Sequence, residues 1–390
     1  MHERCFWSDP GYEANDPLIG NRRARWLIAG GGVAGLFAAY FLLKRGERDI
    51  AIIEKNTVGS GSTGHSAGML VADLETGPWS AVIANYGAEA AGAYMRAQEE
   101  VQRTVAALIE NEGIACDFSL RDFVLLNDSE WAIRRTMREF AARHAIDPRH
   151  PTILEEEELQ NEIRSGEFSF GEYVERGLTV NPLKFAHGIK AYLMRHGVRV
   201  YEHTPLLSYR DGVAYVPHGT VSCGHCIHAS GTWLRDAKLR NYMTTIGVTR
   251  PLSTPELAAL NLADKDMFED DGKRSYHYGK ITADNRLLVG YGDVLGVPDV
   301  PMVSLHTPHV ENIRRFVRRF TGHDIPLEYA WTGQYSLSTG LTAQIVLGER
   351  ESSIGGAGTQ IASITAASYL AAALCREPHP LDAIFERGRE

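Results

Sequence analysis

No uninterrupted apolar run in the 390 residues approaches the roughly twenty that cross a bilayer, and residues 1–23 lack the apolar core of a signal peptide. The five cysteines are an odd number spread over a long chain, which argues against a disulfide framework and favours a reducing compartment. A formal net charge of −9 disfavours nucleic acid, which attracts basic surfaces. We therefore expect a cytoplasmic protein without integral membrane contact or a nucleic-acid partner.

Cys223 and Cys226 have the spacing of a dithiol redox motif. The run leads straight into IHASG, which predicts a strand, where alternate side chains face opposite ways and no helix dipole activates a thiol. Two thiols and scattered histidines also make a poor zinc set. We expect neither a redox nor a metal site, and we interpret the acidic run 155–158 as the solvated start of a helix.

The strongest signal is LIAGGGVAG at residues 27–35. Residues 27–29 predict a short buried strand, which Gly30 ends with a tight turn. Gly32 lets the backbone approach a pyrophosphate, and Gly35 lets the following helix pack close to the sheet. This spacing predicts phosphate binding.

The predicted helix 33–45 presents the N–H groups of Val33 and Ala34 to those phosphates. A second predicted strand, 50–53, leads to Glu54, which can accept hydrogen bonds from ribose hydroxyls. An acid there repels a ribose phosphate, so NADP is disfavoured. Because strand, turn, helix, strand and acid are in register, we predict a dinucleotide site; the alternative is a glycine-rich turn without a ligand.

A second run of small and hydroxylated residues, GSGSTGHSAGML at 59–70, is too polar and flexible for a core element and can wrap a large cofactor. Here the chain resembles the D-amino acid oxidase (DAO) superfamily of FAD-dependent amine and amino acid oxidoreductases, which includes glycine oxidase, sarcosine oxidase and gamma-glutamylputrescine oxidase. The resemblance continues in order along the chain, through VNPLKF at 180–185, HASGTW at 228–233, KITADNRLLVG at 280–290, WTG at 331–333 and GGAGTQIA at 355–362.

The resemblance implies an α/β fold, with a Rossmann-like FAD-binding domain of the glutathione-reductase type and an interleaved α+β substrate domain on a mostly antiparallel sheet. We expect the FAD domain at 20–80, 180–245 and 325–390, and the substrate domain at 81–179 and 246–324. Within the latter, residues 81–112 predict a long helical stretch, 122–127 a strand and 130–144 a helix.

The resemblance also implies which residues hold FAD. They are Gly30, Gly32, Val33, Ala34, Gly35, Glu54, Lys55, Ser62, Thr63, His65, Ser66, Ala67, Gly68, Met69, Leu206, Ser230, Gly231, Gly356, Gly358, Thr359, Gln360 and Ile361. A helix starting near 358–361 would place its positive end by the flavin pyrimidine ring. Trp233 and Trp331 are expected to pack under the flavin.

His65 has two interpretations. GSTGHSAG at 61–68 is similar to a run of the dimethylglycine dehydrogenase branch, GSTWHAAG, whose histidine is bonded covalently to the flavin, although Gly64 replaces the tryptophan. The alternative is an uncharged histidine that hydrogen-bonds a cofactor phosphate or a carbonyl.

The substrate is indicated mainly by an absence. Glycine oxidases carry an arginine that binds the substrate carboxylate two residues past their "W-A-G" segment, where this chain has Tyr335, and the closing loop also lacks an arginine. An amine, or an amino acid whose carboxylate binds elsewhere, is therefore favoured. Tyr278, Tyr335 and Lys280 are the candidate catalytic residues; Lys280 would stabilise developing superoxide, or else be a solvent-facing strand residue. Phe6 and Trp7 are interpreted as an anchor for the amino-terminal tail.

We therefore expect an FAD-dependent enzyme that oxidises a C–N bond to an imine by hydride transfer, with O2 as acceptor and H2O2 as product. One alternative is a dehydrogenase that passes electrons to a carrier protein, with FAD attached at His65. Another is a flavin-binding protein without turnover. The sequence leaves the oligomeric state open, a homo-oligomer included.

Overall fold

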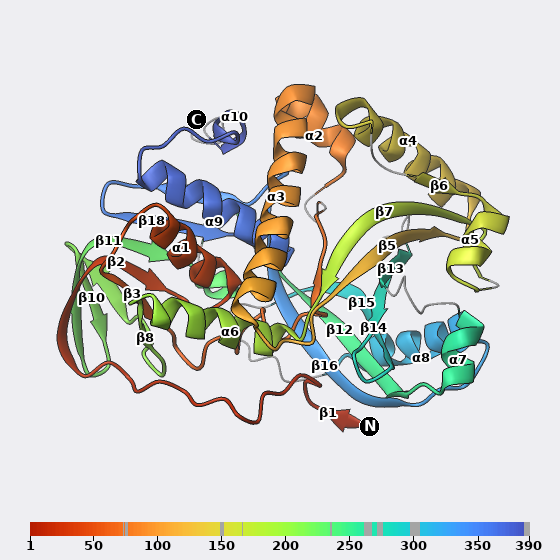
Figure 1. Ribbon diagram of the computed structural model, residues 1–390, viewed down its shortest axis with the longest axis horizontal. Coiled ribbons are helices and arrows are strands. Elements are labelled where there is room, and N and C mark those ends of the chain that lie inside the picture. The colour runs from red at the N-terminus through yellow and green to blue at the C-terminus, as the bar shows by residue number, and fades with distance from the viewer. Residues whose placement is uncertain are drawn as a thin grey trace.

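The computed structural model describes residues 1–72, 74, 77–148, 152–165, 167–234, 236–260, 267–270, 276–296 and 305–385. The described strands form two sheets, which lie on either side of the long helix α3 (Ala88–Glu112) in Figure 1. None of the described helices has a stretch long and apolar enough to span a membrane.

The first sheet has eight strands in the order β17-β18-β11-β2-β3-β8, with β10 and β9 added beside β11. Its strands are β2 (Gly20–Ala29), β3 (Ile50–Ile53), β8 (Arg199–Tyr201), β9 (Ser208–Arg210), β10 (Val213–Val216), β11 (Gly219–His228), β17 (Gln344–Leu347) and β18 (Glu351–Gly355). The central strands β18, β11, β2, β3 and β8 are all parallel. This confirms the Rossmann-like part of the predicted fold.

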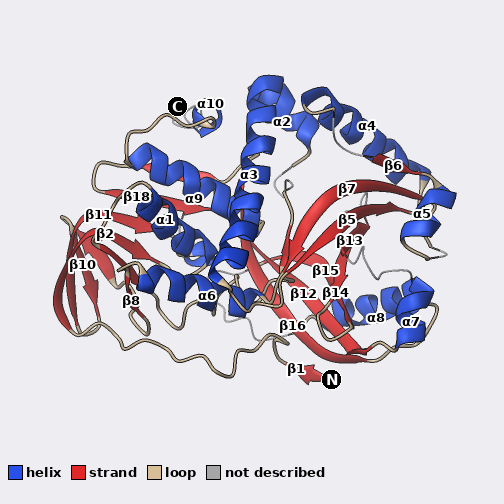
Figure 2. Cartoon of the chain, in the orientation of Figure 1, coloured by secondary structure: helices blue, strands red, loops and turns tan. Residues whose placement is uncertain are grey.

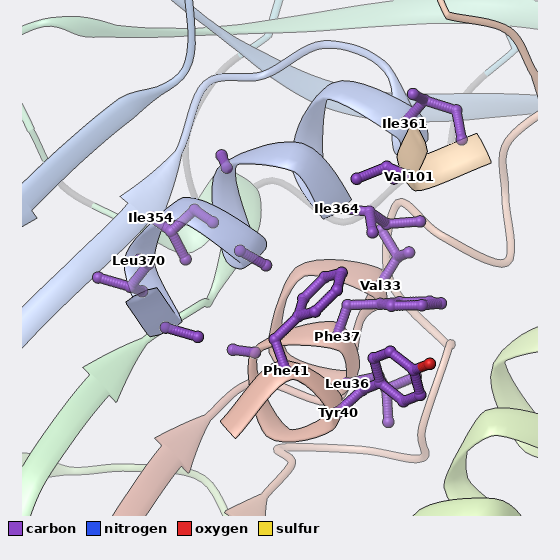
Figure 3. Close-up of a cluster of buried hydrophobic side chains, with 14 of the residues drawn as sticks. Val33, Leu36, Phe37, Tyr40, Phe41, Val101, Ile354, Ile361, Ile364 and Leu370 are labelled. Carbon is purple, nitrogen blue, oxygen red and sulfur yellow. The ribbon is translucent and has the colours of Figure 1, made fainter. Parts of the chain in front are cut away.

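Helix α1 (Val33–Lys44) connects β2 to β3, as the sequence predicts, and ends before Gly46, which has a φ of +83°. It packs against α9 (Gln360–Leu374) through the apolar layer shown in Figure 3. Phe37 and Ile364 are fully buried in this layer. Because both helices are apolar on nearly all sides, they form the centre of the larger core rather than its surface.

The second sheet has ten strands in the order β1-β16-β12-β15-β14-β13-β5-β7-β4, with β6 beside β7. They are β1 (His2–Glu3), β4 (Met69–Leu70), β5 (Ser119–Asn127), β6 (Thr152–Leu154), β7 (Phe170–Thr179), β12 (Leu239–Pro251), β13 (Met267–Asp270), β14 (His277–Ile281), β15 (Arg286–Leu295) and β16 (Leu327–Ser338). Within the described strands of this sheet, only β1 with β16 and β13 with β5 pair in parallel, which confirms a mostly antiparallel sheet.

The remaining helices cover these sheets, as Figure 2 shows. They are α2 (Trp79–Tyr86), α4 (Glu130–Ile146), α5 (Glu156–Glu162), α6 (Pro182–Arg195), α7 (Thr254–Leu260), α8 (Thr307–Thr321), α10 (Asp382–Phe385) and the 3-10 turn η1 (Gly231–Trp233). Phe316 of α8 stacks on Phe268 and, with Val289, belongs to the buried core of the ten-stranded sheet.

One predicted element differs from the structure. The helical stretch 81–112 is two helices, α2 and α3, because Gly87 has a φ of +85°, a conformation that ends a helix. The domain boundaries stay a prediction. The sequence assigns residues 327–338 to the FAD domain, whereas β16 (Leu327–Ser338) belongs to the ten-stranded sheet.

The acidic run is confirmed as a helix start, since Glu155 and Glu158 form a capping box on α5. Cys223 and Cys226 lie in β11, as expected, and both are buried.

Candidate flavin and substrate site

The glycines of the first turn are required by close packing. A Cβ atom on Gly30 would lie 2.3 Å from the Ala229 carbonyl oxygen, and one on Gly35 would lie 2.0 Å from the Gly30 carbonyl oxygen. Gly30 also has a φ of +126°, which disfavours other residues. The turn therefore brings the start of α1 directly against the end of β11.

The amino terminus of α1 is open to an anion. Val33 N–H donates to the Thr63 hydroxyl at 3.0 Å, whereas Ala34 and Gly35 have no acceptor for their N–H groups in the described part of the chain. The first turn has no acidic residue. Unpaired N–H groups and the helix dipole together favour a phosphate at this place.

The residues predicted for the adenosine half lie around the same turn. Glu54 follows β3 and its carboxylate accepts hydrogen bonds from the N–H groups of Gly31 at 2.7 Å and Asn56 at 2.9 Å. The Ser230 nitrogen would lie 3.3 Å from a Cβ atom on Gly30, and Lys55 Nζ lies 3.3 Å from the Trp233 ring centroid. Leu206 lies in the segment that follows β8.

The two tryptophans predicted to pack under the flavin lie in different surroundings. Trp233 is 47% exposed and lies in a surface turn, with Lys55 Nζ over its ring. Trp331 is 4% exposed and its indole N–H donates to the His65 carbonyl at 2.9 Å. Packing of either ring under the flavin stays a prediction.

A cavity of about 410 Å³ extends from the start of α1 to the ten-stranded sheet. Twelve of the predicted residues line it, namely Val33, Ser62, Thr63, His65, Ser66, Ala67, Met69, Tyr278, Tyr335, Gly358, Thr359 and Gln360. Gly68, Gly356 and Ile361 do not line the cavity, and Ile361 is fully buried in the core. The structure therefore brings together two glycine-rich segments that are about three hundred residues apart in the sequence.

Helix α9 begins at the cavity as predicted. The Thr359 hydroxyl accepts a hydrogen bond from Ala362 N–H at 3.1 Å, and Gly356 and Gly358, with φ of +67° and +75°, turn the chain into the helix. The first turn of α9 carries no acidic residue, so its positive end faces the cavity uncompensated.

A polar group of side chains forms the opposite wall. Thr244 of β12 pairs in register with Asp293 of β15 and with Gly333 of β16, and its hydroxyl lies 3.2 Å from the Tyr278 hydroxyl. Tyr335, two residues beyond Gly333, hydrogen-bonds the Asp293 carboxylate. Burial raises the pKa of Asp293, and the hydrogen bond from Tyr335 only partly offsets that rise.

The far end of the cavity carries charges from α4. Arg143 pairs with the buried Glu172 at 2.6 Å, and Glu139 accepts hydrogen bonds from the N–H and hydroxyl of Ser80. Arg135 also lines the cavity there. Sequence reasoning missed these residues and also Thr244 and Asp293; for Asp293, its place three residues after the RLLVG run was an available signal.

Lys280 is neither in the cavity wall nor exposed to solvent. Its side chain is 2% exposed, and Nζ donates to the carbonyls of Gly68 and Val180, both at 2.9 Å. This corrects the solvent-facing alternative. A direct role in oxygen reduction stays a prediction; the bonds that the structure shows hold the backbone behind the 59–68 loop.

The site fits an isoalloxazine with a diphosphate tail. Gln360 is 8% exposed and donates to the Ser66 hydroxyl at 2.6 Å, while its Oε1 is buried without a partner in the described part of the chain. Buried acceptor atoms nearly always have a hydrogen-bond donor, so an unpaired one at a cavity indicates that a ligand supplies the donor, such as the imide N–H of a flavin.

The described residues contain no cluster of side chains that could hold a metal ion.

The sequence profile described as "DAO: FAD dependent oxidoreductase" matches residues 25–375. The chain belongs to this family. FAD is therefore the cofactor.

Individual members of the family match over much of the chain. Gamma-glutamylputrescine oxidoreductase of Escherichia coli (strain K12) is 25% identical over 329 residues, which cover 80% of this chain and 73% of that protein. Mitochondrial dimethylglycine dehydrogenase of Mus musculus is 26% identical over 59% of this chain, but the match spans only 25% of the mouse protein. The crystal structure of glycine oxidase from Geobacillus kaustophilus has a TM-score of 0.75 at 19% identity and covers 92% of this chain and 96% of its own, so it supports the fold.

Proposed function

We propose that this family member oxidises the C–N bond of an amine or amino acid to an imine, with O2 as electron acceptor and H2O2 as second product. The names of the E. coli, mouse and Geobacillus relatives support a C–N substrate. The observation that carries the proposal is the cavity between the start of α9 and the wall formed by Thr244, Tyr278, Asp293 and Tyr335. A bound flavin supplies the hydride acceptor there.

The polar wall can prepare the substrate. An amine must lose its proton before its C–N bond is oxidised, because the nitrogen lone pair forms the imine. Burial favours an uncharged carboxylic acid and a neutral amine over the ion pair, so Asp293 can take that proton at its carboxylate. Tyr335 orients the carboxylate, and Tyr278 with Thr244 provides hydroxyls that orient the substrate.

The substrate class follows from the described cations of the cavity. Tyr335 stands where glycine oxidases carry the carboxylate-binding arginine, and the described arginines of the cavity, Arg135 and Arg143, both come from α4. Arg143 is paired with Glu172. A primary or secondary amine is therefore preferred to an α-amino acid held by its carboxylate close to the reacting carbon. The proposal includes the FAD-binding residues predicted from the sequence. It also includes the division into an FAD domain at 20–80, 180–245 and 325–390 and a substrate domain at 81–179 and 246–324.

Amine-dependent peroxide release tests the acceptor. Purified protein with FAD is mixed with a panel of amines and amino acids in air, and H2O2 is measured by a peroxidase-coupled assay. Peroxide formation matched to bleaching of the flavin band supports an oxidase. Bleaching without peroxide, together with reduction of an artificial dye, would favour a dehydrogenase, and absence of bleaching by any amine would overturn the proposal.

Asp293→Asn is expected to lower kcat/KM for the amine about 100-fold, because an amide cannot take the substrate proton. The acidic limb of the pH profile of kcat/KM is expected to shift with it. Tyr335→Phe is the matched control; it removes the orienting hydroxyl but keeps the carboxylate, and is expected to cost about ten-fold or less. Equal losses in both variants would contradict a proton-accepting role for Asp293.

His65 supports a second candidate, a dehydrogenase with covalently attached FAD. Its Nδ1 lies 2.9 Å from the Gly61 carbonyl, and its Nε2 has no hydrogen bond in the described part of the chain, although the ring lines the cavity. An imidazole nitrogen without a partner is available as a nucleophile toward the flavin methyl edge.

Acid precipitation separates the two candidates. For covalent FAD, the yellow colour is expected in the pellet of the parent protein and in the supernatant for His65→Ala. If the parent protein releases its flavin to the supernatant, attachment at His65 is excluded and the imidazole acts only through hydrogen bonds.

A further inference from the structure

The first eighteen residues, here called the strap, touch both sheets. Strand β1 pairs with β16, with His2 opposite Tyr329, and at the other end Leu18 N–H donates to the Thr204 hydroxyl at 3.0 Å, just beyond β8. Figure 1 shows the strap running from β1 along the edge of the molecule to β2. Between these two ends it passes the 59–68 loop.

Trp7 is the point where the strap contacts that loop. The side chain is 8% exposed and packs with Ala67, Leu288 and Trp331. Its indole N–H donates to the Ser66 carbonyl at 2.8 Å, and Lys280 Nζ lies 5.1 Å from the ring centroid. The anchor expected from the sequence is therefore also a directional hydrogen-bond donor.

The hydrogen bond fixes a peptide plane. The described chain has no cis peptide, and in a trans peptide the carbonyl of one residue and the N–H of the next point in opposite directions. Trp7 holds the Ser66 carbonyl and is not part of the cavity wall, whereas Ser66 and Ala67 are. The Ala67 N–H consequently points away from Trp7, toward the cavity side.

Neighbouring peptides are held in the same way. Trp331 holds the His65 carbonyl and Lys280 holds the Gly68 carbonyl, and neither side chain lines the cavity. Three side-chain donors thus bind the carbonyls of His65, Ser66 and Gly68 on the side of the 59–68 loop that faces away from the cavity. The Ala67 N–H has no acceptor in the described part of the chain, although the residue is only 7% exposed. A buried N–H group without a partner is rare and requires one.

We propose that Trp7 is a positioning residue for the flavin: by holding the Ser66–Ala67 peptide, it presents the Ala67 N–H to an acceptor atom of the isoalloxazine ring. The amino-terminal strap is on this view part of the cofactor site, although it contributes no residue to the cavity wall. The proposal depends on FAD binding and not on the substrate or the electron acceptor.

Trp7→Phe tests the proposal, because phenylalanine keeps an aromatic ring in the packing site and lacks the N–H donor. Trp26→Phe is the matched control: Trp26 is 6% exposed and its indole N–H donates to Glu47 at 2.9 Å, away from the 59–68 loop. FAD affinity is measured by fluorescence titration of the apoprotein, together with the visible spectrum of the bound flavin and the melting temperature of the apoprotein.

We expect Trp7→Phe to bind FAD roughly five-fold more weakly and to shift the visible flavin band, as loss of one fixed hydrogen bond predicts. Trp26→Phe should match the parent in both respects, even if both variants lower the apoprotein melting temperature equally. An unchanged affinity and spectrum in Trp7→Phe would overturn the proposal. If that variant does not fold, Trp7→Leu, which also lacks a side-chain donor, replaces it with the same expected and opposing results.

Discussion

Replacing Glu202 by alanine is expected to lower the free energy of unfolding by about 3–5 kcal/mol. Glu202 is fully buried and pairs with Lys190, which is 4% exposed, at 2.6 Å. The carboxylate also accepts hydrogen bonds from the Tyr12 hydroxyl and from the N–H groups of Asn15 and Val58. Alanine would leave the Lys190 ammonium buried without its counter-charge, which is the main cost. Urea denaturation measures the change.

A double variant distinguishes the lost pair from general disruption. Lys190→Met with Glu202→Leu replaces both charges by apolar groups of similar size, so no uncompensated charge remains. We expect this double variant to recover at least half of the stability that Glu202→Ala loses. A double variant as unstable as Glu202→Ala would show that packing or the strap contacts, rather than the buried Lys190 charge, dominate the effect.

The same pair makes stability depend on pH. Burial raises the pKa of Glu202, but hydrogen bonds from Lys190 and Tyr12 and from two backbone N–H groups outweigh it, so the pKa falls below its ordinary value of 4.5. A lowered pKa in the folded state means that the stabilisation is present above pH 4.5 and is lost as the pH falls through the folded-state pKa. Urea midpoints across this range should fall less steeply in Glu202→Ala than in the parent.

Gly35→Ala is expected to abolish FAD binding and to cost about 3 kcal/mol of stability. The added Cβ would lie 2.0 Å from the Gly30 carbonyl oxygen, which belongs to the backbone turn and cannot move aside. Helix α1 must then shift away from β2, which displaces the N–H groups at which we propose that the FAD phosphates bind. Flavin content of the purified variant and urea denaturation measure the two effects.

Gly11→Ala is the matched control for this change, because nothing lies within 4 Å of a Cβ atom at that position and its φ is not positive. It should retain FAD and the parent stability. If Gly35→Ala also retained both, the close contact between α1 and the turn would not be required for cofactor binding.

Local patterns were sufficient to predict the strand, glycine turn and helix start at which we propose that FAD binds. The glycines at 30, 32 and 35, the strand 50–53 and Glu54 lie within about thirty residues, where steric rules for turns and helix starts fix the geometry. The start of α9 at Gln360 was predictable for the same reason, from glycines before an apolar helix.

The polar wall of the cavity, opposite the start of α9, could not be predicted from local patterns. Thr244, Tyr278, Asp293 and Tyr335 come from four different strands, and only the register of the sheet places Thr244 opposite Asp293. A shift of one residue in any strand would turn its side chains to the other face. No local pattern contains that register, so the sequence indicated Tyr278 and Tyr335 only through resemblance and did not indicate Asp293.

The pairing of β1 with β16 has a consequence for the order of folding. Residues 2–3 and 329–330 are neighbours in the sheet although more than three hundred residues separate them. During synthesis the beginning of the strap is made long before its partner strand, so it cannot dock until most of the chain has left the ribosome. Closure of such a long loop is slow. The strap is thus translated long before β16 and is among the last of these segments to reach its native place, so a nascent chain would acquire the Trp7 contact to the 59–68 loop only after β16 has been made.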